Sequence, residues 1–228
     1  MATLGDAKNI IVGAAQVFVA NGGPLEYYSG TAASATYVFS GETTSGIPAF
    51  VGNTRYEDTL ASSSATWTNV GYTMNGLEVQ FQPDFGEVQV DQLLDVARMY
   101  KQGMQVSLVT AFAEATLENL LYALAFADDQ LTGSKSTSSG RRLNLSAGEL
   151  GECPVERGIA AVGPGTGDCD NSGNVERVYV EYRALSIENV TVSAKRDEPS
   201  MFEVSFRLLP EDASGAYGKI VDRTHTAS

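Results

Sequence analysis

The chain has 228 residues, of which 43% are hydrophobic and 19% charged, which is typical of ordered globular proteins that bury a full core. A formal net charge of -13 argues against binding to nucleic-acid phosphates. The start carries no basic stretch followed by a long apolar core, and the longest apolar run, "LLYALAFA", is far shorter than the roughly 20 residues that span a bilayer, so we expect a protein made in a cytoplasm with no membrane partner.

An apolar stretch at residues 8–20 predicts the first strand or strand pair. The segment at about 21–65 then mixes turn-forming residues with isolated aromatics. Such a long loop is usually functional or disordered, and aromatic side chains argue against disorder because they favour burial. We predict a projecting hairpin or loop that becomes ordered against a neighbour, with contacts from Tyr27, Tyr28, Tyr37, Phe39, Phe50 and Tyr56.

The clearest β pattern lies at residues 74–92, where apolar and polar residues alternate. Leu77, Val79 and Phe81 fall on one face, and "PDFG" at 83–86 supplies turn chemistry. We therefore predict a hairpin that turns at "PDFG" and has one apolar face and one polar face. The polar face comprises Glu78, Gln80, Gln82, Glu87, Gln89 and Asp91.

A further alternating strand at residues 104–114 leads into the strongest helix signal of the chain. A helix is predicted at about 116–129, with Thr116 as its N-terminal cap and Glu118 at the positive end of the helix dipole. Its apolar residues recur at helical spacing, which predicts a stripe that covers one face of a sheet. That stripe contains Leu117, Leu120, Leu121 and Leu124.

A second Gly- and Ser-rich excursion is predicted at about 131–175, with one short strand at 142–145. Residues 175–194 and 200–210 predict a hairpin that turns across "KRDEP". The chain has no internal repeat and no strand–helix alternation. We therefore expect a single domain, 1–228, that is mainly β, with one helix and two long loop excursions.

The sequence contains no complete catalytic or metal-binding pattern. The one histidine, His225, lies near the C-terminus, which argues against Ser-His-Asp and Cys-His sites and against an enzyme, and no cofactor is expected. Asp168, Asp170 and Ser172 occupy the first, third and fifth positions of a calcium loop, but Tyr179 stands where a bidentate Glu is required. The same residues suit a tight turn before a strand.

The two cysteines, Cys153 and Cys169, lie inside the second excursion. They are consistent with two reduced thiols and with a disulfide that closes the loop between them. They do not form a zinc site, because such a site needs four nitrogen or sulfur ligands.

The block from Trp67 to Ala125 resembles the major tail protein, or tail tube protein, of long-tailed bacteriophages. The resemblance lies in the order of the "WTNVG" lead-in, the hairpin that ends at "VDQ", the strand into Glu114 and the "ATLENLLYAL" helix. It implies a β-sandwich or β-barrel with one flanking helix and long interaction loops. It also implies that the chain is a virion subunit that assembles in the host bacterial cytoplasm. Six copies would form a ring, and stacked rings would form a hollow tube through which DNA passes without specific binding.

The same resemblance implies contacts with other tail proteins, namely the tape measure, the tail terminator and the tail tip. It also suggests a place for the polar face of residues 78–91, since an acidic tube wall would repel DNA phosphates. The alternative interpretation of that face is an ordinary solvent-exposed face of a sheet.

A rival interpretation from another class is a ligand-binding β-sandwich, such as a glycan-binding or adhesin module, because exposed aromatic residues suit sugar stacking. A carboxylate-based hydrolase ranks third. Self-assembly separates these classes, since a tube protein forms rings or polymers and a lectin remains a small oligomer.

Overall fold

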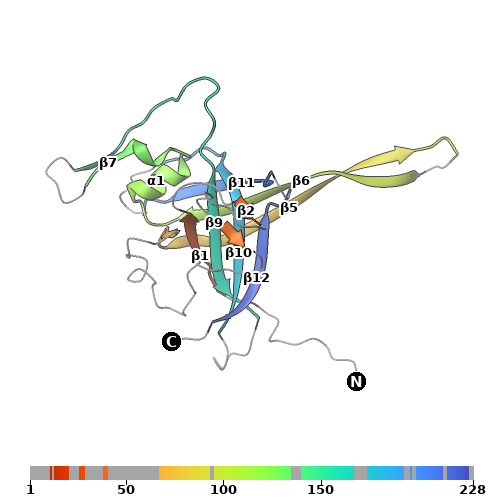
Figure 1. The fold of residues 1–228 in the computed structure, drawn as a ribbon, viewed down its shortest axis with the longest axis horizontal. Coiled ribbons are helices and arrows are strands. Elements are labelled where there is room, and N and C mark those ends of the chain that lie inside the picture. The colour runs from red at the N-terminus through yellow and green to blue at the C-terminus, as the bar shows by residue number, and fades with distance from the viewer. Residues whose placement is uncertain are drawn as a thin grey trace.

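The computed structural model describes residues 11, 13–20, 26–28, 38–40, 67–92, 95–134, 140–166, 174–192, 196, 199–212 and 215–225. The fold is mainly β, with an eight-stranded antiparallel sheet, two small two-stranded sheets and one short α-helix (Figure 1). The elements are β1 Gln16–Ala20, β2 Glu26–Tyr28, β3 Val38–Ser40, β4 Trp67–Asn69, β5 Thr73–Gln89, β6 Val96–Phe112, α1 Leu117–Ala123, β7 Leu131–Gly133, β8 Arg141–Leu143, β9 Arg157–Pro164, β10 Asn174–Ser186, β11 Phe202–Leu209 and β12 Gly218–His225.

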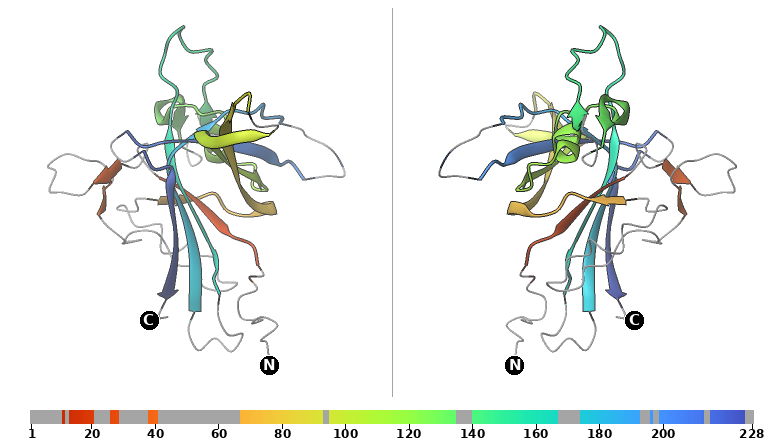
Figure 2. Two further views of the ribbon diagram at one scale, coloured as in Figure 1. Left: turned by 90° about the vertical axis from the view of Figure 1, so that its right-hand side faces the viewer. Right: turned by 90° about the vertical axis from the view of Figure 1, so that its left-hand side faces the viewer.

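The large sheet branches at β10. Its order is β4-β1-β9-β10-β11-β6-β5, and β12 also pairs with β10. The first part of β10, up to Glu181, pairs with β12, and the part from Arg183 onward pairs with β11. In Figure 2 the strands β9, β10 and β12 run together in one part of the sheet, and β11, β6 and β5 form another part. Because β4 and β5 remain at opposite ends, the sheet does not close, and the barrel form of the prediction is wrong for the single chain.

The central strands are buried on both faces, which explains their continuous apolar sequences. Along β1, Val17 and Val19 join the main core, whereas Phe18 and Ala20 join a second buried cluster. In the main core the rings of Phe112 and Phe206 lie 6.4 Å apart between centroids, so β6 and β11 are held together by packing as well as by the ladder.

The predicted helix is present but shorter than 116–129. Thr116 caps it as predicted, since its hydroxyl accepts a hydrogen bond of 3.2 Å from the Asn119 amide. The helix ends because Ala125 has a φ of 54°, the left-handed conformation typical of a helix C-terminus. Residues 128–130 form a separate 3-10 turn.

The helix packs against β11 and against the hairpin formed by β7 and β8. Leu121 is fully buried, Leu120 packs against the main core, and Leu117 and Leu124 are half-buried. An ion pair between Glu118 and Arg141 adds a polar link from the helix to β8.

Three strand predictions need correction. The chain does not turn at "PDFG": residues 73–89 form one continuous strand, and the reversal falls between Gln89 and Val96. Proline is tolerated there because β5 is an edge strand, where an amide donor is not required. The second excursion also contains β9, a buried strand at the centre of the sheet. The hairpin predicted across "KRDEP" has a longer connection, because β10 ends at Ser186 and β11 begins at Phe202.

The strand predicted at 8–20 lies partly outside the described residues, and the structure describes it at Gln16–Ala20. The short strand predicted at 142–145 is described in full and is found at Arg141–Leu143. Within the first excursion the structure describes β2 and β3, which pair in parallel. Among the described residues, no helix has the length and apolar character needed to cross a membrane.

Candidate functional site

A long hairpin projects from the body of the molecule. β5 and β6 pair along their whole lengths, from Thr73 opposite Phe112 to Gln89 opposite Val96. The neighbouring strand β11 stops pairing with β6 at Val106, so no other described strand pairs with the outer part of the hairpin. This outer part, residues 83–103, is here called the arm (Figure 1). Seven residues of β5, 83–89, make it about 20 Å long at roughly 3.3 Å per residue.

The arm exposes apolar side chains that a lone subunit leaves in water. Phe85 is 51% exposed and Met99 is 58% exposed. A two-stranded hairpin by itself is at best marginally stable in water, and exposed apolar patches mark interaction surfaces. We therefore take the arm as the candidate site. Its exposed apolar residues are Phe85, Val88, Val90, Met99 and Tyr100, with Phe81 at its root.

The arm has a defined local structure. The register shifts between Asp84 and Phe85, which places an extra β6 residue, Gln102, opposite that step. A Cβ atom on Gly86 would lie 2.6 Å from the Tyr100 Cζ atom and 2.5 Å from the Gln102 Nε2 atom. The Gln102 amide in turn donates a 3.2 Å hydrogen bond to the Tyr100 hydroxyl. Tyr100 therefore covers the glycine, and the hairpin keeps its shape away from the body.

The predicted polar face is divided by the continuous strand. All six of its residues are exposed. Because successive residues of a strand point to opposite faces, Glu78, Gln80 and Gln82 share one face, whereas Glu87 and Gln89 lie on the other. Asp91 lies in the turn beyond β5. The expectation that all six share one face is therefore corrected, and the residues that remain together on the body are Glu78, Gln80 and Gln82.

That shared face extends over the neighbouring strands. Gln80 pairs with Ser107, which pairs with Arg207 on β11. The Gln80 amide donates a hydrogen bond of 3.0 Å to Glu78. The opposite face of the same strands, with Val79 and Leu108, packs into the main core. This half of the sheet therefore has one buried face and one hydrophilic face.

Several predicted residues lie where the structure describes little or nothing of them. Tyr27 and Tyr28 belong to β2 and Phe39 to β3, but only their backbone is described. Tyr37, Phe50, Tyr56, Asp168, Asp170, Ser172 and Cys169 lie outside the described residues. Cys153 is an exposed thiol. Within the described part of the chain, no group of acidic, histidine or cysteine residues is arranged to hold a metal ion.

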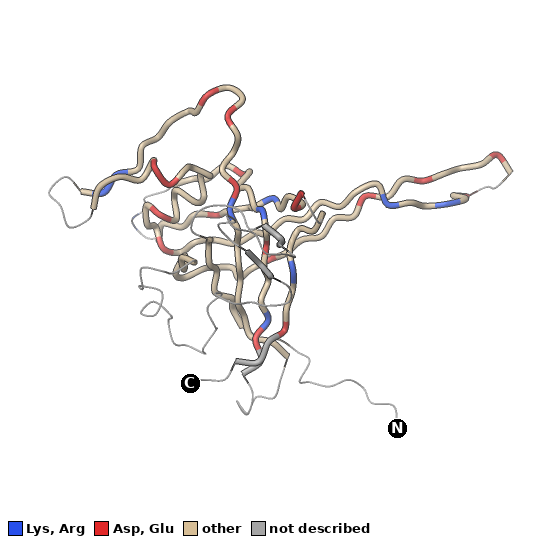
Figure 3. The backbone as a smooth tube through the Cα atoms, viewed as in Figure 1, with Lys and Arg blue, Asp and Glu red and all other residues tan. Residues whose placement is uncertain are grey.

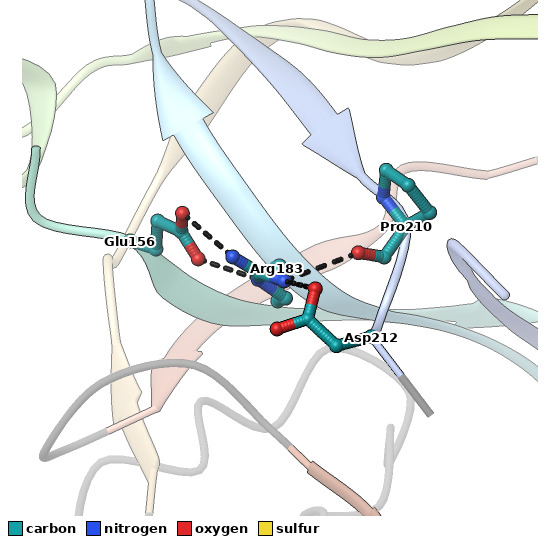
Figure 4. Close-up of polar contacts among 4 residues, drawn as sticks. All are labelled: Glu156, Arg183, Pro210 and Asp212. Carbon is teal, nitrogen blue, oxygen red and sulfur yellow. Dashed lines mark hydrogen bonds and ion pairs between the residues drawn. The ribbon is translucent and has the colours of Figure 1, made fainter. Parts of the chain in front are cut away.

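Charged residues of both signs lie on the body and on the arm (Figure 3). On the body, Arg183 lies between two acids (Figure 4), with 2.6 Å from its Nε atom to Glu156 and 2.6 Å from its Nη1 atom to Asp212. These contacts raise the pKa of the Arg183 guanidinium, which therefore serves as a permanently charged structural link between β10 and the ends of its neighbours.

A cavity of about 610 Å³ lies at the root of the arm. Glu181 of β10 lines it and is only 5% exposed. Burial raises the pKa of this carboxyl to about 7. The alternation in "VYVEYRAL" places Glu181 among ordinary polar positions of a half-exposed strand, so the sequence contains no signal for this burial.

No protein-family model and no curated protein matches this chain. Interpretation of the arm and the cavity therefore depends on their own residues. Their geometry offers apolar area, a projecting ladder and one buried carboxyl, which together suit binding of another polypeptide.

Proposed function

We propose that this chain is a structural virion subunit of the tail-tube type. Copies of it assemble into hexameric rings, and the rings stack into the hollow tail tube of a long-tailed bacteriophage, through which DNA is delivered to the host. Its partners are further copies of itself and the tape measure, tail terminator and tail tip proteins.

The observation that carries the proposal is the arm. It extends about 20 Å beyond the last strand that supports it and exposes Phe85, Val88 and Met99. Burying apolar area is favourable by about 25 cal/mol per Å², so a neighbouring surface that covers these side chains stabilises the assembly. Every subunit carries the same arm, and a repeated contact of this kind builds rings or filaments.

The ends of the open sheet support the same conclusion. β4 and β5 each have one edge without a partner strand in the described part of the chain. Exposed sheet edges invite pairing with other chains, and a closed ring removes them by joining the edge of one subunit to that of the next. The sheet that stays open in one chain can thus become part of a closed wall in the ring.

The acidic composition agrees with a conduit for DNA. In this proposal Glu78, Gln80 and Gln82 line the bore, because they form the hydrophilic face of a sheet whose other face is core. The screening length is about 8 Å at physiological salt, so repulsion of phosphates acts close to the wall. Such a wall lets the duplex pass without binding it.

Sedimentation velocity across a concentration series tests the proposal. The wild-type chain is expected to form large species, and a variant carrying Phe85→Ser and Met99→Ser is expected to remain small at the same concentrations. Ile187→Ser is the matched control, because this residue is 50% exposed but lies outside the arm. A wild-type chain that stays a small fixed species and binds immobilised glycans would favour the ligand-binding module instead.

A further inference from the structure

The cavity at the root of the arm is a gap left where the sheet branches. Its walls come from the residues at the root of the arm, with Phe81 and Met104, and from the segment that leads into β12 and the start of that strand, with Tyr217 and Ile220. The Tyr217 hydroxyl donates a 2.6 Å hydrogen bond to the Met104 carbonyl, which ties the two walls together. The space is therefore part of the fold, and its walls are largely apolar.

Glu181 is the acidic residue that lines this space. Its register neighbour on β12 is Gly218, and a Cβ atom there would lie 2.6 Å from the Glu181 Oε2 atom, so glycine leaves room for the carboxyl. Among the described residues, this carboxyl makes no hydrogen bond and no ion pair. A buried carboxylate without a partner is costly, so a cation that reached it would be bound strongly.

The two lysines that line the cavity do not supply that cation. Lys101 is exposed, and its Nζ atom lies 3.9 Å from the Met104 sulfur. Lys219 is half-buried on β12. Burial is the cause of the raised pKa of Glu181, with no opposing contribution from either lysine.

Arg98, on the arm, has complementary chemistry. It is exposed and makes no ion pair with any described acid. It pairs across the hairpin with Val88, and Tyr100 occupies the next position inward on the same face, so two exposed apolar side chains are its neighbours on that face. A cationic side chain with apolar neighbours is complementary in charge and polarity to an apolar cavity that contains one carboxylate.

The two groups form no ion pair within one subunit. The outermost β6 residue that lines the cavity is Lys101, and Arg98 lies three residues beyond it, about 10 Å farther out along extended backbone. We propose that Arg98 of one copy enters the cavity of a second copy and forms an ion pair with Glu181 there. Each copy offers both groups, so the contact is head-to-tail and repeats around a ring or along a filament. This inference rests on the proposed function and assigns one of its contacts.

A double-mutant cycle on assembly tests the pair. Arg98→Gln and Glu181→Gln are each expected to weaken assembly about 30-fold or more per contact, as truncation of a buried charge pair does. The double variant is expected to be no weaker than the weaker single variant, since both changes remove the same contact. Arg207→Gln and Glu203→Gln, exposed charges on β11, are the matched controls and are expected to assemble like wild type. Circular dichroism checks that every variant is folded.

The possible outcomes distinguish a failure of the Arg98–Glu181 ion pair from a failure of the tube proposal. Wild type that assembles, with both single variants indistinguishable from the controls, overturns the ion pair and leaves the tube proposal standing. An effect of Glu181→Gln without an effect of Arg98→Gln also overturns it, because the partner of Glu181 is then another group. Wild type that never assembles contradicts the tube proposal itself, and the pair with it.

Discussion

Replacing Glu181 with Gln should change how the stability of the subunit depends on pH. Burial raises the pKa of Glu181 from about 4.5 to about 7 in the folded chain. Between these values the folded state keeps a proton that the unfolded state has lost, so the free energy of unfolding falls as pH rises. Each pKa unit corresponds to about 1.36 kcal/mol, so the loss reaches roughly 3 kcal/mol above pH 7.

Gln keeps the size of the side chain and cannot ionise, so the variant should lack this loss. The free energy of unfolding of the variant minus that of wild type should therefore rise by about 3 kcal/mol between pH 4.5 and pH 8. Urea titrations at pH 4.5, 6 and 8 measure it, with Phe85→Ser and Met99→Ser in both proteins to keep them monomeric. Lys101, Lys219 and Tyr217 also line the cavity, and they are identical in the two proteins. A difference that stays constant over this pH range would refute the reasoning.

Two further predictions concern the helix and its surroundings. Arg157→Met should lower the free energy of unfolding by about 2 kcal/mol, because the buried guanidinium donates a 2.8 Å hydrogen bond to the Phe126 carbonyl and lies 5.0 Å from the centre of the Tyr122 ring. Arg142→Met, at an exposed arginine of β8, is the control for urea unfolding and should change little. Thr116→Ala should cost about 1 kcal/mol through loss of the N-terminal cap, and an unchanged thermal midpoint would contradict that role.

Local sequence patterns correctly predicted the features that depend on interactions between residues close in sequence. The alternation around Val79 gives one core-facing side and one exposed side on the body, as observed. Thr116 caps the helix because its hydroxyl needs only the amide three residues ahead. These features depend on neighbours in sequence, so the sequence suffices to find them.

The errors in strand and sheet prediction depend on distant partners. "PDFG" has turn chemistry, but ladder pairing with β6 keeps Pro83 and Gly86 in an extended edge strand. β9 was not predicted, because its neighbours in sequence are rich in Gly and Pro. Its position in the sheet is determined by pairing with β1 and β10. From the sequence, Glu181 would be expected to face solvent. It is buried because residues of β12 and of the root of the arm enclose it. Sheet order, and therefore the arm and the cavity, could not be predicted from local pattern.

Negative-stain electron microscopy of the purified chain, across a concentration series at low and moderate salt, tests the central claim most directly. The account predicts six-fold rings and stacked hollow tubes at the higher concentrations, with the Phe85→Ser and Met99→Ser variant showing only single subunits. Small compact particles of wild type at every concentration and salt would contradict it.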